Sequence, residues 1–210
     1  GFQNTGINKV SYTNAQLGIK GKRPKVHYPV FVQSHAFVRL QERLDCLNPA
    51  TSFLYLHLSL VTCKIYKRGS ESFLIEYILN NVKMGYLVAS LQEGVVVVHT
   101  FLFLTQNGTP EGQKLQEITG LGKLDKEYLA IDKLSTFYAS DIASNEEIRQ
   151  IFISSGCGSL FELNPAWILK NKLGTMRPLA DRIRDYLKVS DTGEDMETYL
   201  KEQMPGMPPD

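Results

Sequence analysis

The chain has 210 residues, of which 43% are hydrophobic, and its formal net charge is only +1. This is enough for one substantial core, and no apolar run approaches the roughly 20 residues of a membrane-spanning helix. Three scattered cysteines, Cys46, Cys63 and Cys157, argue against a disulfide framework or a cysteine zinc site. We therefore expect a globular, cytoplasmic protein without a membrane partner, a metal or a cofactor. The chain begins at Gly1 without a signal-peptide pattern, which leaves open whether a targeting segment was removed.

In chain order, residues 1–25 are polar and basic and show no sustained periodicity, so we expect a flexible basic arm. Residues 26–32 predict a short edge strand. A helix follows from His35 to about Leu47, with Ser34 as its N-cap, and Asn48-Pro49 ends it.

Four β-rich runs follow this helix. Leucines alternate with polar or aromatic residues from Phe53 to Tyr66, which predicts a half-buried strand, and Phe73 to Leu79 predicts another. The runs Met84 to Leu91 and Val95 to Leu104 flank the turn signal Gln92-Glu93-Gly94, which is typical of a hairpin. Residues 26–104 therefore predict one helix on a mostly antiparallel sheet.

The last of these strands is apolar on both faces, so it needs cover on both sides. The C-terminal half has a helical pattern and is expected to supply the second cover. Its predicted starts are Thr109-Pro110, the capping box Ser144 to Glu147, and Asn164-Pro165, and its predicted stops are Gly120, Gly156 and Gly174. The fold class is therefore α+β, with a single domain over residues 26–189, a helical layer over 105–189 and an acidic tail over 190–210.

Charge divides the chain unevenly. Residues 1–104 carry 11 Lys/Arg and 5 Asp/Glu, whereas residues 105–210 carry 12 and 17, so the halves are +6 and −5. All four histidines lie in the basic half. The pattern fits a basic surface for a polyanion such as RNA, and it also fits solvated faces without a binding role.

The first helix carries the main candidate site, because His35, Arg39, Glu42 and Arg43 fall on one arc of it. Histidine can act as a general acid or base near neutral pH, arginines bind phosphate oxygens, and Glu42 can orient His35 or carry a second proton. These residue types suit metal-independent RNA cleavage. Alternatively, His35 only caps and packs, while the arginines pair with Glu42, Asp45 or acids of the C-terminal half.

Residues 26–104 also resemble a known family. A short strand, the helical motif S-H-A-x-x-R-x-x-x-R (Ser34, His35, Ala36, Arg39, Arg43) and antiparallel strands that end in a hydrophobic strand with Thr100 resemble RelE/BrnT-like predicted ribonuclease toxins. That group has the barnase, EndoU, colicin and RelE type of fold and occurs in bacterial mobile elements. The resemblance implies an RNA substrate, a site containing His35, Arg39 and Arg43, and a contribution from His99 or Thr100.

His57 and His99 could approach His35 across the sheet and bind substrate together with Thr100. A histidine metal site is not predicted, because neither HxH nor HExxH spacing occurs. Two hypotheses result. The protein is a ribonuclease or RNA-binding protein of a toxin system, or it is a non-enzymatic binding or regulatory protein whose basic half is covered by its acidic half or by a protein partner. A solvent-open pocket that contains His35 and Arg39 would favour the first.

Overall fold

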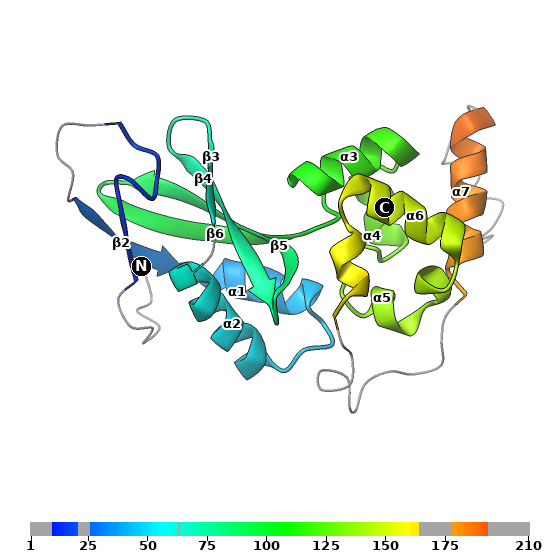
Figure 1. Cartoon of the computed structure of the whole chain (residues 1–210), viewed down its shortest axis with the longest axis horizontal. Coiled ribbons are helices and arrows are strands. Elements are labelled where there is room, and N and C mark those ends of the chain that lie inside the picture. Colours follow the sequence, from blue (N-terminus) through cyan, green and yellow to red (C-terminus); the bar gives the residue numbers. More distant parts are fainter. Residues whose placement is uncertain (1–9, 21–25, 63, 164–177, 193–210) are drawn as a thin grey trace, which may run out of the picture.

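The structure is a computed structural model of the chain, and it describes residues 10–20, 26–62, 64–163 and 178–192. A six-stranded sheet of order β1-β2-β6-β5-β4-β3 carries two helices on one face, and the remaining helices form a group at one end of it (Figure 1). The predicted α+β class is confirmed. Most pairings are antiparallel, but β2 pairs with β6 in parallel, so the sheet is mixed.

The strands are β1 (Ser11–Thr13), β2 (His27–Val32), β3 (Ile65–Arg68), β4 (Ser72–Leu79), β5 (Val82–Gln92) and β6 (Val95–Phe103). The helices are α1 (Ser34–Arg43), α2 (Pro49–Thr62), α3 (Pro110–Thr119), α4 (Lys123–Tyr128), α5 (Thr136–Ala139), α6 (Glu146–Ser155) and α7 (Ala180–Thr192). Two 3-10 turns, η1 (Asp141–Ala143) and η2 (Gly158–Phe161), complete the described elements.

Part of the segment expected to be a flexible arm is a strand. β1 pairs with β2 in antiparallel fashion, and the Tyr12 hydroxyl donates a hydrogen bond to the Leu60 carbonyl oxygen over 2.7 Å. Tyr12 and Leu17 are buried, so apolar side chains anchor this segment to the core. The remainder of the expected arm, residues 1–9 and 21–25, lies outside the described residues.

The strand predicted from Phe53 to Tyr66 is wrong, because most of this segment belongs to helix α2. Asn48-Pro49 was expected to end the first helix, but α1 already ends at Arg43, and Asn48-Pro49 starts the next helix instead. Asn48 Oδ1 accepts a hydrogen bond from the Ala50 N–H over 2.8 Å, and proline is favourable at the first helical position. The side chains buried along α2 recur at helical spacing and are Ser52, Leu56, Ser59 and Leu60.

Helices α1 and α2 cover one side of the sheet, which we call the closed face. β4 packs against α2 through Tyr77, whose hydroxyl donates to the Ser52 carbonyl oxygen over 3.0 Å. The Tyr77 and Phe101 rings meet edge to face, with centroids 5.4 Å apart. Phe73, Ile75, Tyr77 and Phe101 are at most 1% exposed, so this side holds the main core.

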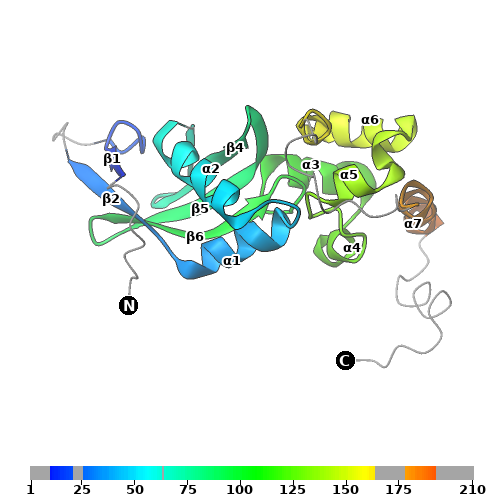
Figure 2. The same cartoon turned by 90° about the horizontal axis from the view of Figure 1, so that it is seen from below.

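The other side of the sheet, which we call the open face, carries Tyr66, Arg68, Leu74, Tyr86, Val88, Ser90, Thr100 and Leu102, as the strand registers require. The C-terminal helices pack against the end of the sheet rather than along this face (Figures 1 and 2). Ser159 of η2 donates its hydroxyl to the Lys83 carbonyl oxygen there. The C-terminal helices were expected to cover the second face of β6, and they do so only near this end of the sheet.

Capping explains the helices of the C-terminal half. Thr109 caps α3 by accepting the Gly112 N–H over 2.9 Å, as predicted, and Gly120 ends this helix with a positive φ of 75°. The N-cap of α6 is Asn145, one residue after the predicted cap, and Gly156 ends α6. The predicted signals Asn164-Pro165 and Gly174 lie outside the described residues.

Helix α7 extends to Thr192 and so includes the first residues of the expected acidic tail, whose remainder is not described. Among the described helices, none has the length and apolar character that a bilayer crossing requires.

Candidate functional site

The predicted catalytic cluster on α1 is divided by ion pairs. Arg43 Nη1 contacts Asp132 Oδ2, and Arg43 Nη2 lies 3.6 Å from Glu127 Oε1. The side chain of Arg43 is 11% exposed and that of Asp132 is 1% exposed. The Arg43 carbonyl oxygen also accepts the Leu134 N–H over 2.8 Å. Arg43 therefore fastens the segment between α4 and α5 to the end of α1.

The remaining residues of the cluster lie on the surface. Arg39 Nη1 is 2.7 Å from Glu42 Oε2, and both side chains are close to half exposed. His35 is exposed in the first turn of α1, and it has no hydrogen bond within the part of the chain that the structure describes. The contacts of Arg39 and Arg43 are those of the alternative interpretation, in which the arginines pair with nearby acids.

The other histidines do not join His35. His57 lies on α2, above the closed face, and its Nδ1 is buried without a hydrogen-bond partner among the described residues. His99 lies at a β-bulge in β6, and its Nε2 is 2.7 Å from Ser90 Oγ on the open face. The sheet thus separates His99 from the other two. In the described ranges, no group of His, Cys, Asp or Glu is placed to hold a metal ion.

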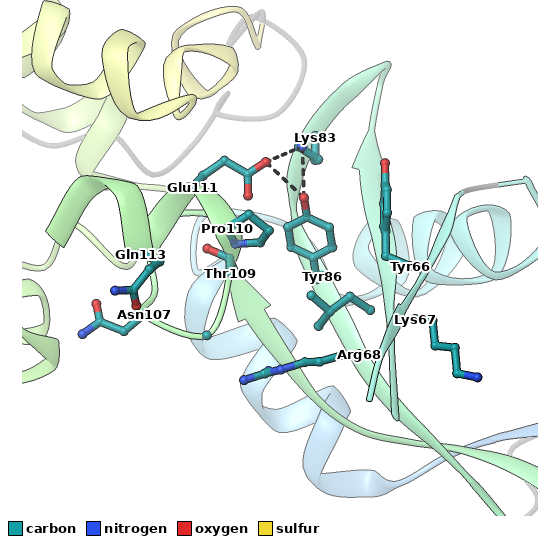
Figure 3. A pocket seen from close by; sticks show the side chains of 12 residues that line it. Tyr66, Lys67, Arg68, Lys83, Tyr86, Asn107, Thr109, Pro110, Glu111 and Gln113 are labelled. Carbon is teal, nitrogen blue, oxygen red and sulfur yellow. Dashed lines mark hydrogen bonds and ion pairs between the residues drawn. The ribbon is translucent and has the colours of Figure 1, made fainter. Parts of the chain in front are cut away.

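A pocket of about 600 Å³ opens instead where the open face meets the start of α3 (Figure 3). The sheet contributes polar and aromatic side chains from β3 and β5 and an apolar side chain from β4, and the loop before α3 closes the other side. Its lining consists of Tyr66, Lys67, Arg68, Leu74, Lys83, Tyr86, Asn107, Gly108, Thr109, Pro110, Glu111 and Gln113. A pocket of this size can hold one nucleotide or a similarly sized ligand.

A carboxylate, an amine and a phenol meet on one side of the pocket (Figure 3). Glu111 Oε1 lies 2.5 Å from Lys83 Nζ and accepts the Tyr86 hydroxyl over 3.0 Å. Burial alone would lower the pKa of Lys83, but hydrogen bonds to Glu111 and Tyr86 outweigh it and raise that pKa. Burial raises the pKa of Tyr86 to about 12. At neutral pH the amine is therefore charged and the phenol keeps its proton.

A second carboxylate orients the aromatic side chain at the pocket rim. The Tyr66 hydroxyl donates to Glu76 Oε1 over 2.8 Å, and this hydrogen bond raises the pKa of Tyr66. Lys83 Nζ lies 3.9 Å from the same oxygen. The Tyr66 residue is 43% exposed, and its ring meets the Tyr86 ring edge-on at 6.2 Å. One edge of the Tyr66 ring is thus held while the rest of the residue remains accessible.

Two cations on β3 differ from Lys83 because they have no ion pair within the described ranges. Arg68 is exposed and belongs to the open face, whereas Lys67 alternates to the other side of β3. In Figure 3, Arg68 extends from β3 towards the loop before α3, and Lys67 points away. The positive charge of Arg68 is therefore available to an anionic ligand in the pocket.

A buried lysine, Lys126, holds the loop before α3 in place through hydrogen bonds. Lys126 is 1% exposed, and its Nζ donates to Asn107 Oδ1 and, over 2.7 Å, to the Gly112 carbonyl oxygen. Burial lowers the pKa of Lys126 to about 8. These contacts fix the loop that contributes Asn107 to the pocket.

The pocket could not be recognised in the sequence because its residues come from four separate segments. Tyr66 and Arg68 alternate with Lys67, which would have placed them on one face of a strand, but the predicted strand ended at Tyr66 and so did not include Lys67 or Arg68. Glu111 follows the predicted helix start Thr109-Pro110, and no local pattern marks it as a site residue. Comparisons of the chain with protein-family models, with curated proteins and with solved structures gave no match.

Proposed function

We propose that the protein binds single-stranded RNA on the open face of its sheet and holds one nucleotide in the pocket at α3. The observation that carries this proposal is the exposed Tyr66 ring beside Arg68, a cation without an ion pair, at the rim of a pocket of about 600 Å³. An aromatic side chain can stack on a base, and a guanidinium can bind a phosphate through two hydrogen bonds.

The open face continues from the pocket along β5 and β6. Thr100 and His99 follow on this side, with His99 hydrogen-bonded to Ser90, so polar groups are available beyond the first nucleotide. His99 and Thr100 remain candidate ligand-binding residues. His57 does not, because it lies on α2, which packs on the closed face through contacts such as that of Tyr77 with Ser52. The charge of +6 in residues 1–104 also favours a polyanion.

Fluorescence anisotropy with a labelled single-stranded RNA tests the proposal. Stacking contributes about 1–3 kcal/mol per base, so Tyr66→Ala should weaken binding roughly 5- to 150-fold. Arg68→Ala should weaken binding and should reduce the salt dependence by the contribution of about one phosphate contact. The matched controls are Tyr128→Ala, at a similarly exposed tyrosine on α4, and Lys123→Ala. Absence of RNA binding, or equal losses in the controls, would refute the proposal.

Metal-independent ribonuclease activity in the same pocket is a second candidate, which the cluster of Glu111, Lys83 and Tyr86 favours. Glu111 would take the proton from the 2′-hydroxyl group, and the 2′-oxygen would form a bond to phosphorus. The bond from phosphorus to the 5′-oxygen would break, and this oxygen would take the proton of Tyr86. Lys83 would stabilise the charge on the phosphorane. The products are a 2′,3′-cyclic phosphate and a 5′-hydroxyl group.

Cleavage of the same RNA in the presence of a chelator tests this candidate. Loss of a general acid or base lowers the rate by about 10²–10⁴-fold, so Glu111→Gln and Tyr86→Phe should both be nearly inactive. Glu117→Gln, at an exposed residue of α3, is the matched control. Wild-type protein that binds RNA without cleaving it would refute the ribonuclease and leave RNA binding as the function.

A further inference from the structure

Helix α2 presents an apolar surface on the side that faces away from the sheet. Its 14 residues include no Asp, Glu, Lys or Arg. Four large apolar residues of this helix, Phe53, Leu54, Leu58 and Val61, are between 39% and 56% exposed. Single exposed apolar residues are common, but a group of them on one uncharged helix is typical of an interaction surface.

The opposite side of α2 is firmly held, so this surface belongs to a well-packed helix. Leu56 and Leu60 are buried, and the Tyr77 and Tyr12 hydroxyls donate to the Ser52 and Leu60 carbonyl oxygens. Among the described elements, none covers the outer side of α2 (Figures 1 and 2). The C-terminal helices, which could have covered it, lie at the end of the sheet.

The apolar surface continues onto α1. The Phe37 and Phe53 rings stack at 5.3 Å, which joins the two helices, and Val38, the residue that follows Phe37, is exposed. A stable interface buries about 800 Å² on each partner, so a contact through α2 has to include this part of α1. We call Val38, Phe53, Leu54, Leu58 and Val61 the α2 patch.

We propose that the α2 patch is the interface of a symmetric homodimer, in which α2 of one chain packs across α2 of a second copy. Ala50, Leu54, Leu58 and Thr62 are all exposed and form one i, i+4 ridge, with small residues at its ends and leucines at its centre. Two such ridges can interdigitate, which is the commonest way in which helices pack.

Electrostatics also favour a second copy as the occupant. A twofold axis brings identical surfaces together, so any charge near the axis would meet a like charge. Helix α2 has no charged residue that would do so. If the axis runs across the helices, their directions are opposed, and the positive end of each helix dipole lies towards the negative end of the other. The proposal is independent of the RNA-binding function, because the pocket lies on the open face.

Sedimentation velocity of the full chain over about 1–100 µM tests the dimer, a range that detects micromolar dissociation constants. We expect the wild type to sediment as a dimer at the upper end of this range. Leu54→Glu and Leu58→Glu each enter a symmetric interface twice, so each should raise the dissociation constant at least about 100-fold, equivalent to two tenfold losses. The matched control is Leu124→Glu, because Leu124 on α4 is 76% exposed and lies outside the α2 patch.

Far-UV circular dichroism confirms that the glutamate variants are folded. Should one of them not fold, oxidative cross-linking of Leu58→Cys gives an independent readout, with Leu124→Cys as its control. A covalent dimer is expected only from Leu58→Cys. A wild-type chain that stays monomeric at about 100 µM would overturn the proposal, as would a dimer that Leu54→Glu and Leu58→Glu leave intact. A contact of the α2 patch with a different protein, combined with a monomeric chain, would also overturn it.

Discussion

The ion pair between Arg43 and Asp132 provides the sharpest test of whether Arg43 on α1 has a structural role or a catalytic one. Asp132 is 1% exposed, and Arg43 is 11% exposed and lies between two acids. Removing one partner of a buried ion pair leaves an uncompensated charge and typically costs about 3–5 kcal/mol. We therefore expect Arg43→Met or Asp132→Asn to lower the free energy of unfolding by about this amount. For a chain of this length the loss corresponds to a fall in Tm of roughly 6–20 °C.

The chain contains its own control for this prediction. Arg39 and Glu42 form a similar pair at 2.7 Å, but both side chains are close to half exposed. Exposed pairs contribute about 0.2–1 kcal/mol, so Arg39→Met should change stability far less than Arg43→Met. Urea unfolding followed by circular dichroism measures both, and the double variant Arg43→Met/Asp132→Leu should recover much of the loss. Equal effects of Arg39→Met and Arg43→Met would refute the structural role of Arg43.

Three further predictions concern the loop beside the pocket and the surface of α1. Burial lowers the pKa of Lys126 from 10.5 to about 8. Between about pH 8 and pH 10.5 the unfolded chain therefore binds more protons than the folded chain. The free energy of unfolding should rise with pH over this range, by up to about 3 kcal/mol. Lys126→Met should remove this rise in urea unfolding measured from pH 7 to 11, and an unchanged slope would contradict the assignment. A Cβ atom at Gly112 would lie 2.0 Å from a backbone carbonyl oxygen, so Gly112→Ala should destabilise the fold by about 3 kcal/mol. Gly122→Ala serves as the control. Equal melting temperatures of the two variants would show that the loop adjusts to the added methyl group. His35→Ala and Arg39→Ala should each change stability by less than about 0.5 kcal/mol. If a RelE/BrnT-like site on α1, rather than the pocket, cleaves RNA, His35→Ala should slow cleavage by about 10²–10⁴-fold through loss of a general acid or base, and Arg39→Ala should slow it through loss of a phosphate contact. Unchanged cleavage in both variants would remove α1 from the site.

The hairpin of β5 and β6 could be predicted because its turn carries a local signal. β5 ends at Gln92 and β6 begins at Val95, so the loop consists of Glu93 and Gly94. Both residues have positive φ, 48° and 82°, as a two-residue turn with the favoured twist requires. The cap of α3 was predictable for the same reason, since Thr109 and Pro110 act within one turn of the chain.

Helix α2 could not be recognised from periodicity, because its apolar residues lie on every side. Leu54, Leu56, Leu58 and Leu60 alternate in sequence as they would on one face of a strand, yet two of them are buried and two are exposed. Only the packing of α2 on the closed face determines which of these leucines are buried and which are exposed. The parallel pairing of β2 with β6 depends in the same way on contacts between residues far apart in the sequence.

The candidate site on α1 shows how far a helical pattern can support a functional conclusion. The pattern placed Arg39, Glu42 and Arg43 on one arc, and it left open whether acids of the C-terminal half would engage them. The decisive acid, Asp132, lies 89 residues after Arg43 and between two short helices. No local signal links the two positions. Which cations are engaged is therefore a tertiary property.

The same reasoning applies to the charge of the basic half. A net charge of +6 over residues 1–104 suggests a broadly cationic surface, but individual acids of the other half reduce it. Asp132 engages Arg43, and Glu111 engages Lys83 beside the pocket. Arg68 has no such partner within the described residues, although it lies on the same open face as Tyr66. A polyanion gains most from a cation whose charge is not already compensated, so under the proposed function Arg68, rather than the total charge, sets where RNA would bind.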